Sequence, residues 1–422
     1  MKNVDFTGKK ILVLAGAGVH SKVVRAAKEM GIYTIVTDYL EDSPAKQIAD
    51  EAWMIDIMDV DQIVSKCREV GVDGVVNFCI DPAQRPYLEI CEKLGLPCYT
   101  TKQQLDILTD KNRFKKYCIA HAVDVIPEFS IEEIKTDKAE YPLFIKPSIN
   151  RGSRGQFICY SKKEAVLAYS KAEAESADRK AICEKYMKGN QDIGSAYFVV
   201  NGEPYLVKIG DRFLGKEQDG LSNQVMCTRL PSSFSNQYTS NVSLRVKDMI
   251  RSMGIQYGPV FLQGFVDGDT IRYYDPARRM PGGDYDLILK NATGFDTVKS
   301  MIAFSLTGDV SSCYGNPENS YMLNEGCALL FTISSRPGRI SKIVGFNRLL
   351  SHPYVVYGRQ IVKENEIVPN SGDIKQRIAA IGAYIPKGGS PKNFLNEVYS
   401  TYHVFDENNK EMIISRVDGN VL

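Results

Sequence analysis

Residues 143–156, LFIKPSINRGSRGQ, combine an apolar strand with a loop whose residue types suit an anion. Tyr141 to Ile145 form a short apolar run that predicts a strand, and Lys146 stands at its exit, before Pro147. The loop that follows contains Arg151, Gly152, Ser153, Arg154 and Gly155. Glycines let backbone N–H groups approach an anion closely, and guanidinium groups can bind its oxygens in pairs. The stretch fits a polyphosphate site, and it also fits a solvated turn after an edge strand.

Further segments in a fixed order along the chain favour the polyphosphate interpretation. They are Lys111 in LTDKNRFKKY, residues 181–192 with the sequence AICEKYMKGNQD, and residues 273–283 with the sequence YYDPARRMPGG. Together with the lysine and glycine loop they resemble the ATP-grasp superfamily, in particular its carbamoyl-phosphate-synthase-like and amino-acid-ligase-like members. The resemblance covers the chain from Ile11 to about residue 415, and it depends on the order and spacing of the motifs.

The resemblance implies how the triphosphate of ATP would be held. Lys111 matches the first phosphate-binding lysine of the superfamily, Lys146 matches the second, and the loop from Arg151 to Gly155 would cover the phosphates. Lys111 lies in a helical stretch, where a solvated lysine on the helix surface is the alternative.

The resemblance also assigns the adenosine contacts to the segment around residue 185. The backbone carbonyl of Lys185 and the N–H of Met187 would bind adenine, because an extended backbone offers both an acceptor and a donor. Glu184 and Asp192 match acidic positions of this hinge, and Asp192 would accept the ribose hydroxyls. Charges on a strand surface remain the alternative for Glu184 and Lys185.

A predicted hairpin, GPVFLQGFVDGDTIRYYD, carries the expected metal ligands. Its turn is Asp267-Gly268-Asp269, so Gln263 and Asp275 fall on neighbouring strands. The resemblance places ligands for Mg²⁺, or alternatively Mn²⁺, at these two positions, and oxygen donors suit both ions. The sequence departs from the family here: the usual Glu-x-Asn-x-Arg is replaced by DPARR (residues 275–279), and Ala277 cannot bind a metal.

The same segment contains the residues expected at the reacting group. Arg279 matches the arginine that holds the substrate carboxylate, and the backbone at Gly282 and Gly283 would stabilise a developing oxyanion. A surface cation is the alternative for Arg279.

Residues 11–100 alternate between predicted strands and helices, which is typical of a parallel sheet with helices on both faces. The strands are expected at ILVLAGAG, YTIVTD, GVVNF and LPCYT. Gly16 and Gly18, with Asp38 ending the second strand, approach a dinucleotide-binding fingerprint, but Ser21 takes its third glycine position. The resemblance instead implies a Rossmann-like domain that lines the site of the second substrate.

Three further elements are expected in the remaining chain. A helical stretch from Gln103 to His121 opens the ATP-binding part, residues 211–223 are expected to form a loop, and a helix is expected at GDIKQRIAAIGAY, residues 372–384. The resemblance implies an α/β and α+β multidomain fold class. The domains are expected at 1–108 (Rossmann-like), 109–187 and 188–335 (small and large ATP-grasp subdomains) and 336–422 (β-rich).

Composition excludes several classes of protein. The 422 residues are 44% hydrophobic and 24% charged, with a net charge of +1, so nothing favours binding to nucleic acid or an anionic membrane. The ten cysteines form no C-x-x-C pair, which indicates reduced thiols and a cytoplasmic protein. A homodimer is compatible with these features.

The predicted function is an ATP-dependent ligase that joins a small carboxylate to an amine, or less often a thiol, through an acyl phosphate. Two alternatives stay open. Ala277 suits a non-catalytic or impaired ATP-binding protein, and the glycine loop at Gly16 suits an NAD-dependent oxidoreductase.

Overall fold

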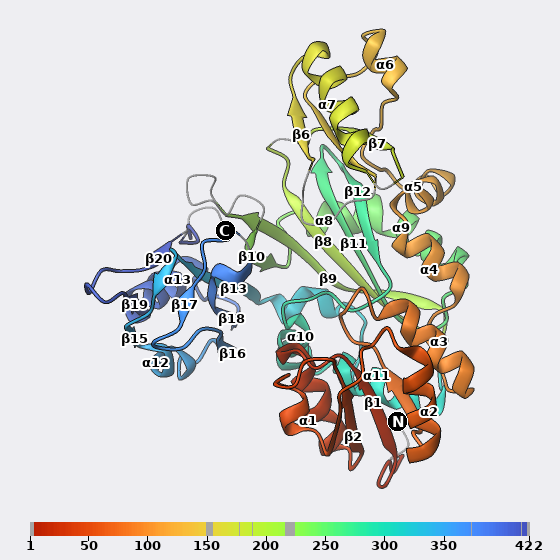
Figure 1. The fold of residues 1–422 in the computed structure, drawn as a ribbon, viewed down its shortest axis with the longest axis vertical. Helices are drawn as coiled ribbons and strands as arrows, with labels where there is room; N and C mark the ends of the chain where they lie inside the picture. Colours follow the sequence, from red (N-terminus) through yellow and green to blue (C-terminus); the bar gives the residue numbers. More distant parts are fainter. Residues whose placement is uncertain are drawn as a thin grey trace.

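The computed structural model describes residues 4–148, 155–176, 178–187, 189–215, 224–372, 374–414 and 416–419. These residues build two larger sheets, a small three-stranded sheet and two short ribbons. In Figure 1 the N-terminal sheet lies at the bottom, the small sheet at the top and the C-terminal strands to the left. None of the described helices is long and apolar enough to cross a membrane.

The N-terminal sheet is parallel, with the strand order β3-β2-β1-β4. Its strands are β1 (Lys10–Leu14), β2 (Tyr33–Thr37), β3 (Glu51–Trp53) and β4 (Gly74–Val76), and its helices are α1 (Ser21–Glu29), α2 (Val60–Val70) and α3 (Gln84–Leu94). The sheet confirms three of the four strands expected here, whereas the short strand β3 was not predicted.

The strand predicted at LPCYT is wrong. Its residues, 96–100, are irregular, because their backbone serves other partners. The carbonyl of Tyr99 accepts a hydrogen bond from the buried guanidinium of Arg278, which also binds the carbonyls of Tyr257 and Pro259. Pro97 has no N–H to donate to a sheet.

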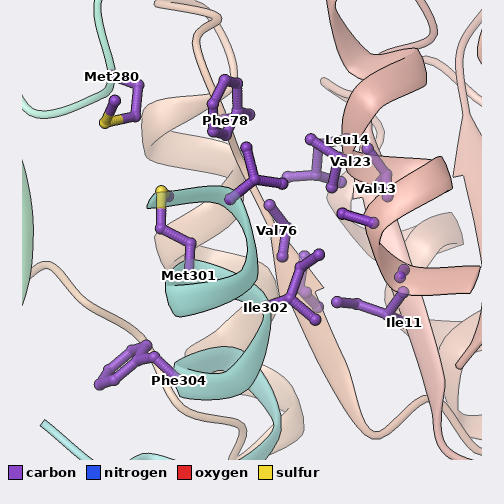
Figure 2. Close-up of a cluster of buried hydrophobic side chains, with 14 of the residues drawn as sticks. Ile11, Val13, Leu14, Val23, Val76, Phe78, Met280, Met301, Ile302 and Phe304 are labelled. Atoms are coloured by element: carbon purple, nitrogen blue, oxygen red, sulfur yellow. The ribbon is translucent and has the colours of Figure 1, made fainter. Parts of the chain in front are cut away.

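One face of the N-terminal sheet is covered by a helix from much later in the chain. Ile302 and Met301 of α11 (Thr297–Thr307) belong to the same hydrophobic cluster as Ile11 of β1 and Val76 of β4, and Figure 2 shows Ile302 between the two strands' side chains. Apolar burial of this kind connects the N-terminal sheet to the centre of the protein.

The largest sheet runs through the centre and the C-terminal part of the chain, in the order β12-β11-β8-β9-β10-β13-β18-β16, with β20 (Ile413–Ile414) paired to β13. Its other strands are β8 (Asp192–Val200), β9 (Glu203–Leu214), β10 (Val225–Leu230), β11 (Gly258–Asp267), β12 (Thr270–Ala277), β13 (Cys327–Ser335), β16 (Val355–Gln360) and β18 (Arg377–Ile385). The sheet therefore continues across residue 336, where a domain boundary was expected.

The small sheet carries β5 (Leu143–Pro147) between β6 (Phe157–Cys159) and β7 (Ala181–Lys185). Two helices, α6 (Ile131–Lys135) and α7 (Lys162–Glu175), share its hydrophobic cluster through Ile134 and Ala165. The strand continues through Pro147, so Lys146 lies within β5 and pairs with Ile182 of β7 instead of marking the strand's end.

Two helix predictions need correction. The stretch from Gln103 to His121 is two helices, α4 (Lys102–Thr109) and α5 (Lys111–Ala120), because the side chain of Asp110 accepts the N–H groups of Asn112 and Arg113 and caps a new helix. The helix predicted at residues 372–384 is wrong: residues 374–376 form a short 3-10 turn, and residues 377–385 form β18. Its run of buried residues lies between two neighbouring strands, and an apolar run of this length does not separate helix from strand.

The other elements are α8 (Ser235–Gln237), α9 (Ser243–Ser252), α10 (Tyr285–Thr293), α12 (Phe346–Leu350), α13 (Pro391–Thr401), β14 (Gly338–Arg339), β15 (Lys342–Val344), β17 (Ile367–Val368) and β19 (His403–Phe405), with short 3-10 or π turns at 18–20, 46–48, 238–242, 320–325 and 374–376. All ten cysteines are free thiols, as expected.

Candidate active site

Lys146 and Glu184 form an ion pair between two neighbouring strands of the small sheet, the central strand β5 and the edge strand β7. The Nζ atom of Lys146 on β5 lies 2.5 Å from Oε2 of Glu184 on β7. The other carboxylate oxygen of Glu184 binds Lys115 of α5, which also binds Glu128. Burial acts to raise the pKa of Glu184, but the two lysines outweigh it and lower that pKa. Glu184 is thus an ionised, buried anchor that orients Lys146.

Arg212 organises a second group of side chains on the large sheet. Its Nη1 donates to Oδ1 of Asp192 at 3.0 Å, to Oε1 of Gln263 at 2.8 Å and to the hydroxyl of Tyr274 at 3.0 Å. Burial raises the pKa of Asp192 to about 6, although Arg212 opposes this shift. The predicted ribose ligand and one predicted metal ligand are therefore joined by a single guanidinium.

The two expected metal ligands are direct neighbours. Gln263 of β11 and Asp275 of β12 are register partners, and Nζ of Lys111 lies 3.1 Å from Oδ1 of Asp275. A carboxylate and an amide oxygen on adjacent strands fit Mg²⁺, which binds proteins through few side chains and takes its other ligands from phosphates and water. Ala277 is 4% exposed and belongs to the main hydrophobic cluster, so it contributes no donor.

Arg279 follows β12 and binds a carboxylate with two bonds. Its Nε lies 2.5 Å from Oδ1 of Asp81, and its Nη2 lies 2.6 Å from Oδ2. The Asp81 side chain is 59% exposed, whereas that of Arg279 is 13% exposed. The guanidinium is therefore fixed in a geometry that suits a carboxylate, and the exposed Asp81 occupies it.

Gly283 lies just before α10 in a conformation that favours glycine, with φ +90°. Its carbonyl accepts the hydroxyl of Tyr357 at 2.8 Å, which holds the turn against β16. An added Cβ would meet no atom within 4 Å, so the requirement for glycine comes from the backbone angle.

Lys208 of β9 is a cation that the sequence analysis did not select. It is 5% exposed, and its Nζ lies 5.6 Å from the ring centre of Phe261 and 5.2 Å from that of Tyr285. Burial, followed by Arg212 and Arg279, lowers the pKa of Lys208 to about 7.

Part of the predicted nucleotide site lies outside the described residues: Arg151, Gly152, Ser153 and Arg154. Gly155 is described, with φ +68°, and an added Cβ would lie 2.9 Å from Cγ of Pro147. The N–H of Lys185 donates to the carbonyl of Pro127 at 2.9 Å, which leaves its carbonyl as the group proposed for adenine. That contact and the one from Met187 remain predictions.

The geometry at Asp38 disfavours the NAD alternative. One carboxylate oxygen of Asp38 accepts the N–H of Gly16 at 2.7 Å, and the other accepts the N–H of Leu40 at 2.8 Å. Asp38 is 8% exposed, and its carboxylate supports its own loop instead of presenting acceptors for a ribose.

Five residues of this region were missed by sequence reasoning: Asp81, Lys115, Lys208, Arg212 and Tyr274. Arg212 lies in the stretch expected to be a loop, but β9 continues to Leu214. The alternation of Lys208, Gly210 and Arg212 is the signal that could have placed both cations on one face of a strand.

No family model matches the chain. It is 27% identical over 178 residues to a formate-dependent phosphoribosylglycinamide formyltransferase of Prochlorococcus marinus subsp. pastoris, covering 41% of this chain and 45% of the relative. It is also 27% identical over 227 residues to the 2-oxoglutarate carboxylase small subunit of Hydrogenobacter thermophilus, covering 48% of each. The chain thus spans about half the length of these curated relatives.

Solved structures match over nearly the whole chain. Phosphoribosylglycinamide synthetase from Anaerococcus prevotii has a TM-score of 0.76 at 17% identity, covering 94% of this chain and 100% of that one. L-amino acid ligase from Bacillus licheniformis has a TM-score of 0.75 at 16% identity, covering 95% and 100%. The biotin carboxylase domain of the Hydrogenobacter thermophilus 2-oxoglutarate carboxylase, in complex with MgADP, ADP and bicarbonate, has a TM-score of 0.70 at 19% identity, covering 96% and 91%. These likenesses show that the chain shares its fold, mixed sheets with helices, with these proteins.

Proposed function

We propose that the protein is an ATP-dependent ligase that joins a small carboxylic acid to an amine. The observation that carries the proposal is the register pair Gln263 and Asp275, flanked by Lys111 on one side and Arg212 on the other. Oxygen donors between cations suit a metal–triphosphate complex.

The reaction has two steps. A carboxylate oxygen of the acid attacks the γ-phosphorus of ATP, the bond to the β-phosphate oxygen breaks, and ADP leaves with its electron pair. The amine then attacks the acyl carbon, the C–O bond to phosphate breaks, and the amide forms as the ammonium proton is lost to solvent. The protein contributes positive charge and positioning.

The named residues divide this work among them. Lys146, fixed by Glu184, and Lys111 would contact the phosphates; Asp192 would accept the ribose hydroxyls. The carboxylate of the acid substrate would displace Asp81 from Arg279, because the two donors of Arg279 already fit a carboxylate. Gln263 and Asp275 would hold Mg²⁺, which neutralises phosphate charge when bound.

The names of the similar proteins support this proposal. They include a synthetase, an amino acid ligase and carboxylases, and one of them binds MgADP. That last structure is a dimer, and we propose a homodimer here also. The division into domains at residues 108, 187 and 335, the Rossmann-like character of the first domain and a cytoplasmic location belong to the same proposal.

Ala277 and Gln263 support one second candidate, a protein that binds ATP without turning it over. Both positions lack a carboxylate, so Asp275 is the only anionic side chain of the proposed metal pair. A weakly held metal would leave ATP bound but unreactive.

Phosphate release separates the two candidates. The protein is incubated with MgATP and a matrix of carboxylic acids and amines, and inorganic phosphate is measured. The ligase releases phosphate only with a matching acid, and faster when the amine is also present. ATP binding by calorimetry with no acid-dependent release across the matrix favours the non-catalytic protein.

A further inference from the structure

Lys208 lies on the same face of the large sheet as the proposed metal ligands. Its register partner is Ala196, which pairs with Phe261, and Phe261 in turn pairs with Ala277. Residues directly opposite each other in an antiparallel sheet point to the same side. The row that contains Lys208 is therefore two residues from the row that contains Gln263 and Asp275.

Lys208 has no counter-ion among the residues that the structure describes. Two neighbouring cations are each paired: Arg212 with Asp192, and Arg279 with Asp81. Its Nζ atom lies over the aromatic rings of Phe261 and Tyr285 instead. A buried ammonium without a partner is costly, so the site attracts an anion.

The order of the chain places Lys208 beside the reacting end of the site. Tyr285, whose ring contacts the ammonium, is the first residue of α10 and comes two residues after Gly283. Arg279 comes two residues after Ala277, which lies in the same row of the sheet as Lys208. An acid bound to Arg279 would therefore lie near Lys208.

Building on the proposed function, we infer that Lys208 selects the acid substrate by binding a second negatively charged group on it. The fork of Arg279 satisfies both oxygens of one carboxylate, as its contact with Asp81 shows. A monocarboxylic acid would leave Lys208 uncompensated, whereas a carboxylate or phosphate elsewhere on the same molecule would neutralise it.

A general base for the amine is the other role that a buried lysine can take. The lowered pKa of Lys208 is compatible with that role, so the substrate preferences of the variants below are what separate it from selection of the acid. A base would also change kcat and its pH profile without affecting the choice of acid.

Matched ligands test the inference. The probes are L-aspartate with L-asparagine, L-glutamate with L-glutamine, and O-phospho-L-serine with L-serine, which separate a second carboxylate from a phosphate. Each is titrated in thermal-shift and calorimetric binding measurements and in MgATP-dependent phosphate release. The proteins are the wild type, Lys208→Met and Lys208→Arg.

Lys46→Met is the matched control. Lys46 is also a buried lysine, 7% exposed, but its Nζ donates to the carbonyls of Leu40 and Asp38 at 2.8 and 3.1 Å. Loss of Lys46 should affect stability and leave the preference between paired ligands unchanged.

We expect the wild type to bind the acidic member of at least one pair about 100-fold or more tightly than the neutral member. The neutral ligand would leave the buried ammonium of Lys208 without a partner, which weakens its binding. Lys208→Met should reduce that ratio at least about tenfold, and Lys208→Arg should retain part of it. The inference is overturned if no acidic member binds better than its counterpart, or if Lys208→Met keeps the ratio. If the acidic and the neutral member of each pair support phosphate release equally, the inference about Lys208 is overturned. The proposed ligase function would not be affected by that result.

Discussion

Gln263 and Asp275 are register partners on β11 and β12, and a different cation holds each of them. Arg212 donates to Gln263 at 2.8 Å, and Lys111 lies 3.1 Å from Asp275. The pair brings together the helix α5, the hairpin and the strand β9, which are far apart in the sequence.

Asp275→Asn should weaken the response to magnesium. The substitution keeps the shape of the side chain but removes the only anionic donor of the pair, so we expect a roughly 10- to 100-fold loss of turnover at limiting Mg²⁺. The measurement is ATP turnover against Mg²⁺ concentration. Asp269→Asn, in the exposed turn of the same hairpin, is the control and should match the wild type. Identical Mg²⁺ curves for Asp275→Asn and the wild type would remove Asp275 from the metal site.

Lys146→Ala should lower turnover by about 2–4 kcal/mol in transition-state stabilisation, the usual effect of losing one electrostatic contact to a reacting phosphate. The fold should survive, because Glu184 keeps Lys115 as a partner. Steady-state kinetics with MgATP and circular dichroism are the measurements. Lys162→Ala removes an exposed lysine that pairs with Asp137 and should change neither. Unaltered kinetics in Lys146→Ala would contradict a phosphate contact.

Lys208 should make stability depend on pH above neutrality. Its pKa is lowered from 10.5 to about 7 in the folded state, so the unfolded chain binds more protons between these values. The destabilisation is fully present below pH 7 and disappears as the pH rises to about 10.5. Lys208→Met should therefore be more stable than the wild type at pH 7, with a difference that shrinks by pH 10. Urea unfolding at pH 7, 8.5 and 10 measures it, and a constant difference would contradict the shift.

Ile302→Ala tests the contact between α11 and the N-terminal sheet. Ile302 is fully buried with Ile11 and Val76, so truncation should cost about 2–5 kcal/mol of unfolding free energy. Leu306→Ala is a useful comparison, because Leu306 is on the same helix but only partly buried and should cost less. Equal losses would mean that the two helix positions are packed alike.

The hairpin of β11 and β12 could be predicted because its information is local. Alternating aromatic and β-branched residues flank Asp267-Gly268-Asp269, and the turn fixes the register of Gln263 with Asp275. The sequence pattern also predicts the parallel N-terminal strands, through their alternation with helices.

The missed features depend on partners distant in the sequence. The sequence of β18 resembles that of a helix because both faces of the strand are buried. The strands β13 and β16, which pair with it, come earlier in the chain. Lys208 and Arg212 were overlooked because Gly210 and Asp211 resemble the start of a loop, whereas pairing with β8 and β10 extends the strand. The role of Asp81 could not be predicted from the sequence, because its partner Arg279 is distant along the chain.

The most direct test of the ligase mechanism follows the oxygen atoms of the acid. The acid that gives the fastest phosphate release is labelled with ¹⁸O in its carboxyl group and incubated with MgATP, the amine and the protein, and the phosphate is examined by mass spectrometry. An acyl phosphate transfers one carboxyl oxygen to phosphate, so each turnover should yield phosphate with one ¹⁸O atom. Phosphate that carries no ¹⁸O from the acid would contradict the mechanism.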